Sequence, residues 1–127
     1  MRRSGLCGGM AVALDVGANI GWYSLIIEKM ARIPLDIFAF EPDPGNYAHL
    51  MANLHVNNLA AKVRALPLAV GSQAGEVELM EAGGHNRGES WIAHPDKPPE
   101  EAPGVASHRV RQVRFDDEFA IAGKTLV

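Results

Sequence analysis

The sequence predicts an α/β fold in which helices alternate with the strands of a doubly wound, mainly parallel sheet. Three short apolar runs, at residues 10–16, 35–40 and 63–66, are separated by two segments whose apolar side chains recur at helical spacing. Apolar runs without alternation are typical of central strands in parallel sheets, which are buried on both faces. The order strand, helix, strand, helix, strand favours right-handed crossovers within one sheet. With 127 residues, 47% of them hydrophobic, the chain can form one domain with its own core.

The first strand, at residues 10–16, ends in a glycine-rich turn that leads into the first helix. The apolar positions of this helix form one stripe, which we expect to be core: Tyr23, Ile26, Ile27 and Met30. Pro34 closes the helix, because proline cannot continue a helical hydrogen-bond ladder.

The second strand, at residues 35–40, ends at Glu41 and is followed by the second helix. Asp43 reads as the N-cap and Pro44 as a first-turn residue, where the missing N–H has no cost. Asn57 and Asn58 are suited to end this helix, since asparagine tolerates the left-handed conformation. The predicted core stripe of the helix consists of Tyr47, Leu50, Met51 and Leu54. A third strand covers residues 63–66 and is expected to extend to residue 70.

The second half of the chain has a different pattern. Residues 76–79 alternate polar and apolar side chains, which predicts a half-exposed strand. Residues 82–104 form a long loop rich in glycine and proline, and loops of this length are typically active-site lids or disordered segments. Residues 105–115 are extended, and Asp116 caps a short helix that continues through Phe119 and Ile121 to Gly123.

Residues 124–127 resemble the opening of a further strand. We therefore expect residues 1–127 to be a single, partial domain that is truncated before its fourth core strand. Such a domain would leave the edge of its first strand open. An open edge predicts a homo-oligomer or association with other chains.

Composition excludes several classes of protein. Twelve basic and fifteen acidic residues give a net charge of -3, so a nucleic-acid partner is not expected. No apolar run reaches the roughly 18 residues of a membrane helix, and a signal peptide is absent, so we expect a cytoplasmic protein without membrane contact. Cys7 is the single cysteine and excludes an intramolecular disulfide. His49, His55 and His108 lack metal-ligand spacing, so no metal is expected.

The turn at residues 15–21 and Glu41 are the strongest functional candidates. Glycines in a turn between a buried strand and a helix let the backbone approach a ligand closely, and the helix N-terminus favours an anionic group. Glu41 follows the next strand, where an acidic residue accepts hydrogen bonds from the ribose hydroxyls of an adenosine. The pattern therefore predicts a nucleoside-containing cofactor.

These motifs resemble a known family. Residues 15–24 (Asp-Val-Gly-Ala-Asn-Ile-Gly-Trp-Tyr-Ser) resemble the first motif of class I methyltransferases, and especially of the FkbM family. Residues 40–44 and 53–57 are similar to that family's next segments, residues 68–71 and 75–79 to the run after its third strand, and residues 115–117 to the segment before its fourth. Family members normally continue into a Lys-x-Asp-Val-Glu-Gly stretch, which this sequence lacks.

The resemblance implies a Rossmann-like fold, S-adenosyl-L-methionine as the cofactor, and methyl transfer to an oxygen of a sugar, polyketide or similar small molecule. By position, the residues of the first turn surround the methionine end of the cofactor, Glu41 holds the ribose, and two residues after the third strand lie near the adenine. The first-turn residues are Asp15, Gly17, Ala18, Asn19 and Gly21, and the adenine residues are Leu68 and Ala69.

The long loop supplies the candidates for catalysis, His85, Asn86 and Ser90. Methylation of a hydroxyl requires removal of its proton, and a histidine titrates in the range that suits a general base. Further candidates for substrate handling are Arg87, Trp91 and His94. The alternative is that these are ordinary polar residues of a solvated loop.

Two other functions stay open. A nicotinamide-dependent oxidoreductase uses the same fold and acidic residue, although the turn lacks the Gly-x-Gly-x-x-Gly spacing. A non-catalytic half-domain that associates through its sheet edge is the second alternative. Arg109, Arg111 and Arg114 lie on the extended segment and are expected to be the charged face of an edge strand.

Overall fold

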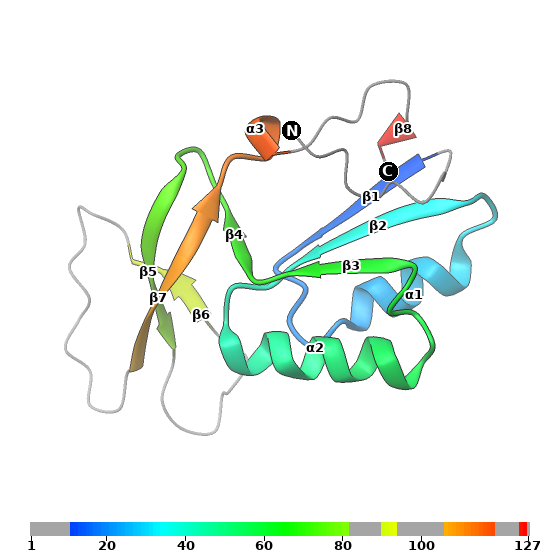
Figure 1. The fold of residues 1–127 in the computed structure, drawn as a ribbon, viewed down its shortest axis with the longest axis horizontal. Coiled ribbons are helices and arrows are strands. Elements are labelled where there is room, and N and C mark those ends of the chain that lie inside the picture. Colours follow the sequence, from blue (N-terminus) through cyan, green and yellow to red (C-terminus); the bar gives the residue numbers. More distant parts are fainter. Residues whose placement is uncertain (1–10, 82–89, 94–105, 119–124, 127) are drawn as a thin grey trace.

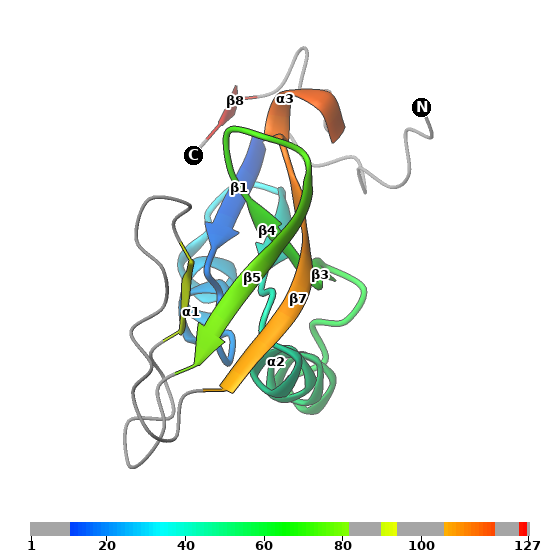
Figure 2. The same cartoon turned by 90° about the vertical axis from the view of Figure 1, so that its left-hand side faces the viewer.

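A computed structural model of the chain describes residues 11–81, 90–93, 106–118 and 125–126. It contains two four-stranded sheets, whose strand orders are β3-β2-β1-β8 and β4-β7-β5-β6. The second sheet lies beyond the carboxyl ends of β1, β2 and β3, as the two views in Figures 1 and 2 show. The arrangement is a mixed α/β fold and is consistent with a Rossmann-like domain.

The first sheet is parallel throughout. Its strands are β1 (Ala11–Val16), β2 (Leu35–Phe40), β3 (Val63–Leu66) and the short β8 (Thr125–Leu126). Helices α1 (Trp22–Met30) and α2 (Pro44–Val56) connect β1 to β2 and β2 to β3, and both lie on one face of the sheet (Figure 1). The predicted strand–helix–strand–helix–strand order is confirmed. The predicted start of a strand near the chain end is confirmed as well, since β8 pairs with Ala11 and Val12 of β1.

Side chains of β1 and β2 alternate between two apolar clusters, because successive residues of a strand point to opposite faces. Ala13 and Ile37 pack with Leu50 and Leu54 of α2. Phe38 and Phe40 belong to a separate cluster, against which Leu66, Leu68 and Val70 are packed. Both faces of the central strands are therefore covered, which explains their continuous apolar sequence.

The start of α2 has the predicted capping. The Asp43 carboxylate accepts a hydrogen bond from the Asn46 backbone N–H at 2.9 Å, and Pro44 occupies the first helical turn. The helix ends at Val56, with Asn57 as its C-cap at φ −91°, and the next residue, Asn58, is left-handed with φ 58°. Both asparagines therefore stand at the helix end as expected, and the left-handed conformation is confirmed for Asn58.

The predicted core stripe of α1 holds for Ile27, which packs against the core, and is wrong for Tyr23, Ile26 and Met30. Tyr23 and Met30 are 68% and 74% exposed, and Trp22 is exposed as well. Beside Ile27, the side of α1 that faces the core carries Ser24, which is fully buried. The buried hydroxyl of Ser24 donates to Asp15 near the end of β1 at 2.7 Å, so this side of the helix faces the strand. In α2 the prediction holds for Leu50 and Leu54, whereas Met51 is 43% exposed.

The second sheet begins where the third predicted strand breaks. Pro67 separates β3 from β4 (Leu68–Val70), and β4 pairs with the second sheet rather than with β2. A proline has no N–H for a sheet ladder and is suited to such a switch between sheets. The remaining strands of this sheet are β5 (Gly75–Glu81), β6 (Ser90–Ile92) and β7 (Ala106–Val113). Only the β4–β7 pair is parallel.

Three expectations about the second half need correction or extension. The strand that bears Arg109 and Arg111 is not an edge strand, because β7 pairs with β4 on one side and β5 on the other. The loop at residues 82–104 contains β6, which pairs with β5. The predicted helix is one turn, α3 (Phe115–Glu118), and Asp116 is its second residue rather than its cap. The predicted continuation at residues 119–123 lies outside the described residues. Within the described parts of the chain, no helix combines the length and apolar character needed to cross a membrane.

The contrast between α1 and α2 can be tested by truncating one side chain on each helix. Leu54→Ala removes a fully buried side chain and is expected to lower the free energy of unfolding by about 2–5 kcal/mol. Met30→Ala removes an exposed side chain and is expected to change it by no more than about 0.5 kcal/mol. Urea unfolding followed by circular dichroism measures both. A comparable loss for both variants would contradict the assigned orientation of α1.

Candidate functional site

A groove of about 240 Å³ lies between the carboxyl ends of the first sheet and the inner face of the second. In open α/β sheets, ligands bind outside the carboxyl ends of the strands, so this is the place where a ligand is expected. The residues that line it are Val16, Gly17, Asn19, Phe40, Glu41, Pro42, Asn46, Leu68, Ala69, Val70, Leu79, Ser90, Trp91 and Ile92.

The turn after β1 is held against the end of β2. The backbone N–H groups of Gly17 and Ala18 both donate to the Phe40 carbonyl oxygen at 2.9 Å. Gly17, Asn19 and Gly21 have positive φ angles of 75°, 53° and 92°, so this turn needs residues that tolerate the left-handed region. The sequence supplies two glycines and an asparagine at these positions.

The side chain of Asp15 is bonded to α1 and does not line the groove. Its Oδ2 accepts a hydrogen bond of 2.7 Å from the Ser24 hydroxyl, and both side chains are buried. Buried carboxylates require such partners, because loss of hydration is costly. Asp15 therefore joins the end of β1 to the first turn of α1 behind the ligand-facing surface.

Glu41 is the buried acid that lines the groove. Its backbone N–H donates to the Leu66 carbonyl, which fixes it at the point where β2 and β3 end. The Asn46 side-chain amide donates to Glu41 Oε1 at 3.2 Å. The residue is only 5% exposed, although it contributes to the wall of the groove.

The surroundings of Glu41 disfavour its charged form. Burial raises the pKa of its carboxyl above the ordinary value, and the nearby carboxylates of Asp43 and Asp15 raise it further, while hydrogen bonds from Asn46 and the Asp43 backbone oppose these effects. Hydrogen-bond donors from a ligand would offset the lost hydration. The site is thus suited to a ligand with hydroxyl groups at this position.

The other walls of the groove are apolar. Leu68 and Ala69 of β4 line one part of it, and Leu79 and Ile92, which are cross-strand partners on β5 and β6, line another. A flat aromatic ring can bury its faces against such side chains. The groove thus combines apolar walls with the buried acid and the glycine turn.

The structure brings together most of the predicted cofactor residues. Gly17, Asn19, Glu41, Leu68 and Ala69 line the groove, whereas Asp15, Ala18 and Gly21 are buried in the supporting turn. Among the predicted loop residues, Ser90 and Trp91 line the groove. His85, Asn86, Arg87 and His94 lie outside the described residues.

Sequence reasoning missed Asn46 and the apolar pair Leu79 and Ile92. Asn46 stands five positions after Glu41 in the first turn of α2, and this spacing is the one signal that would have identified it. Leu79 and Ile92 reach the groove through the pairing of β5 with β6, which no local pattern indicates.

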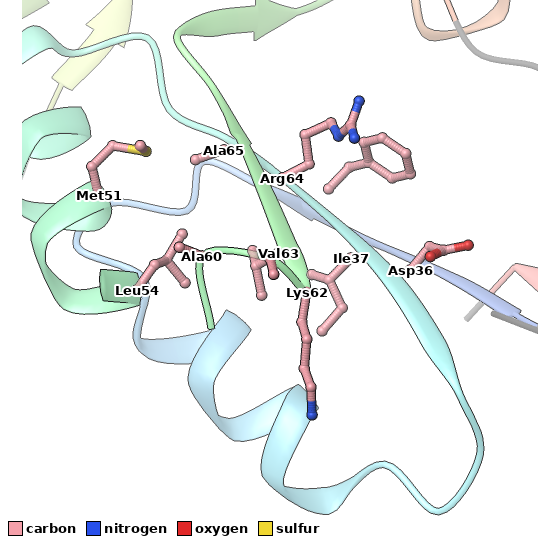
Figure 3. Close-up of a pocket in the computed structure, with 11 residues that line it drawn as sticks. Asp36, Ile37, Met51, Leu54, Ala60, Lys62, Val63, Arg64 and Ala65 are labelled. Carbon is pink, nitrogen blue, oxygen red and sulfur yellow. The ribbon is translucent and has the colours of Figure 1, made fainter. Parts of the chain in front are cut away.

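A second hollow, of about 210 Å³, lies along β3 and the connection that precedes it (Figure 3). Its lining includes Asp36 and Val63, near the amino ends of β2 and β3. Lys62 also lines it, and its Nζ lies 3.0 Å from Glu28 Oε1 on α1. Its lining includes neither Glu41 nor any residue of the turn after β1, so it is a poor match for a cofactor site at the carboxyl ends of the strands.

The two glycines of the turn allow a matched test of its geometry. A Cβ on Gly17 would have no neighbour within 4 Å, so Gly17→Ala is expected to cost only the backbone strain of roughly 1–2 kcal/mol. A Cβ on Gly21 would lie 2.6 Å from Leu50 Cδ1, so Gly21→Ala adds a steric cost of about 1–3 kcal/mol. Urea unfolding of both variants measures the difference. In a Leu50→Val background, which lacks Cδ1, Gly21→Ala should cost less; an unchanged cost would contradict the contact.

Comparison with known proteins relates part of the chain to a methyltransferase. The chain is 40% identical over 67 residues to Methyltransferase sdnD of Sordaria araneosa. The match covers 52% of this chain and 25% of that protein, so the matched stretch spans about a quarter of the relative's length. No family profile matches the chain, and no solved structure matches it. About half of the chain is therefore related in sequence to a methyltransferase.

Proposed function

We propose that this chain binds S-adenosyl-L-methionine and belongs to a methyltransferase of the FkbM kind, which methylates an oxygen of a sugar, polyketide or similar small molecule. The motifs at residues 15–24 and 40–44 support the family, and the 40% identity to a methyltransferase supports the class of reaction. The single observation that carries the cofactor assignment is that Glu41 and the glycine turn line the same groove.

The proposed orientation of the cofactor follows from the groove walls. The Glu41 carboxylate accepts hydrogen bonds from the ribose hydroxyls, in the role that an acid after the second strand has in nucleotide-binding folds. The adenine lies against Leu68 and Ala69, with Leu79 and Ile92 on the second sheet. The methionine end lies along the turn at Gly17 and Asn19.

The turn allows its backbone to lie close to the cofactor, but the N–H groups of Gly17 and Ala18 are not available to bind it. The N–H groups of Gly17 and Ala18 are already bonded to the Phe40 carbonyl. The first N–H groups of a helix lack intrahelical partners, so the N-terminus of α1 is the better attraction for a carboxylate. The family resemblance places the whole turn at the methionine end. We propose more narrowly that the turn lies along the methionine chain and that the N-terminus of α1 attracts its carboxylate.

The bound cofactor supplies a methyl group that its sulfonium has already activated, so the task of the protein is chiefly to position the acceptor. The acceptor hydroxyl must point at the methyl carbon and lose its proton as the new bond forms. Ser90 lines the groove and can orient that hydroxyl. We propose His85 as the base and Asn86 as a further polar contact.

Replacement of Glu41 tests the assignment. Glu41→Ala removes the acceptor of the ribose hydroxyls and is expected to weaken binding of S-adenosylhomocysteine at least tenfold, as measured by isothermal titration calorimetry. A factor of ten corresponds to about 1.4 kcal/mol, which is within the value of a hydrogen bond to a charged group. The control is Glu76→Ala, because the Glu76 side chain is 72% exposed on the second sheet.

Unchanged affinity of Glu41→Ala, with circular dichroism showing a folded chain, would contradict the orientation. Displacement of the bound molecule by NAD would support the oxidoreductase alternative instead. A folded chain that binds neither compound and whose mass rises with concentration would support the non-catalytic alternative.

A further inference from the structure

Three potential metal ligands from three different elements meet beside the groove. Asp43 caps α2, Glu81 is the last residue of β5, and His108 is near the start of β7. One ligand atom from each lies within 4.8 Å of the other two. Figures 1 and 2 both show the N-terminal end of α2 beside the end of β5 and the start of β7. The spacing of the histidines in the sequence gave no sign of this cluster.

The pairing of the strands places Glu81 and His108 on the groove side of the second sheet. His108 is the direct partner of Leu79, and Glu81 is two residues beyond Leu79, so all three point to the same face. Leu79 lines the groove, as does Ser90, the direct partner of Glu81 on β6. The cluster therefore lies at the rim of the cofactor groove, next to a proposed substrate contact.

One separation within the cluster fits a small divalent ion, and the Asp43 oxygen lies within 4.8 Å of both other ligand atoms. His108 Nε2 and Glu81 Oε2 are 3.3 Å apart. Ligands that bind a tetrahedral ion at about 2.0–2.2 Å are separated from one another by roughly 3.3–3.6 Å. The two side chains are 41% and 35% exposed, so an ion has access to them and water can complete its coordination.

Asp43 is held in place by its structural role. Asp43 is 5% exposed, and its Oδ1 accepts a hydrogen bond from the Asn46 backbone N–H at 2.9 Å. A carboxylate has four lone-pair positions, so the cap leaves acceptor capacity for an ion.

We propose that Asp43, Glu81 and His108 bind one divalent transition-metal ion, with Zn²⁺ preferred over Mg²⁺. An imidazole nitrogen with two carboxylate oxygens is a mixed donor set that suits zinc, whereas magnesium prefers oxygen ligands alone. The ion joins α2 of the first sheet to β5 and β7 of the second. It thereby fixes the distance between two walls of the groove.

Zinc titration of the chelator-treated, folded chain tests the site. Calorimetry is expected to show one Zn²⁺ per chain, with Mg²⁺ in excess failing to compete, and the midpoint of thermal unfolding is expected to rise with zinc. Glu81→Gln and His108→Ala should each weaken zinc binding at least about tenfold, since even indirect partners of metal ligands contribute that much. The control is His55→Ala, because His55 is exposed on α2 and outside the cluster.

Asp43→Asn separates metal binding from folding. Asparagine caps helices as well as aspartate does, so the variant should fold like the wild type while its zinc affinity falls. Absence of zinc binding by the folded wild type would overturn the proposal and leave His108 and Glu81 as an ion pair. Equally tight binding by wild type and cluster variants would also overturn it and assign the ion to other residues. The titration contains no S-adenosylhomocysteine, so its outcome is independent of the proposed function.

Discussion

The Phe40 carbonyl oxygen is the point on which the candidate site depends. It accepts the N–H groups of Gly17 and Ala18, and so it joins the turn after β1 to the last residue of β2. Glu41 follows directly, and its own N–H is bonded to the end of β3. Three parallel strands are thus joined at their carboxyl ends by backbone hydrogen bonds alone. The glycine turn and the acid share one groove because these bonds leave their separation little freedom.

Three acids gather at this edge, and each is held in a different way. Asp15 is bonded to the buried Ser24 hydroxyl, Glu41 accepts the Asn46 amide, and Asp43 caps α2. Each arrangement offsets the cost of removing a carboxylate from water. Of these three acids, only Glu41 lines the groove, and burial and the two neighbouring carboxylates raise the pKa of its carboxyl.

The second sheet turns an open sheet end into a groove with walls. Pro67 ends the ladder of β3, and the chain continues at once as β4 in a different sheet. Leu68 and Ala69 consequently face the same space as Glu41, and Ser90 reaches it through the pairing of β6 with β5. Pro67, which has no N–H for a sheet ladder, therefore stands where the chain passes from the first sheet to the second and begins the apolar wall.

The sequence by itself determined the elements of the first sheet, their order and the acid that follows β2, because these features are local. A buried strand, a left-handed turn and a capped helix each require particular residue types within a few positions, and those residues can be read directly. The local sequence did not determine which side of α1 is buried. Tyr23, Ile26 and Met30 formed a convincing apolar stripe, yet Ser24, which is bonded to Asp15, occupies the buried side of the helix and these three side chains are exposed.

Only the tertiary structure decided which distant residues meet. Asn46 acts on Glu41 through the geometry of a helix start, Leu79 and Ile92 reach the groove through an antiparallel pair, and Asp43, Glu81 and His108 converge from two sheets. The pairing of strands far apart in sequence depends on the packing of the whole chain, and no short pattern records it. The sequence therefore determined the wall of the groove that the ends of β1 and β2 form, because each of its parts is local. The tertiary structure decided the wall formed by the second sheet, because that wall depends on the pairing of distant strands.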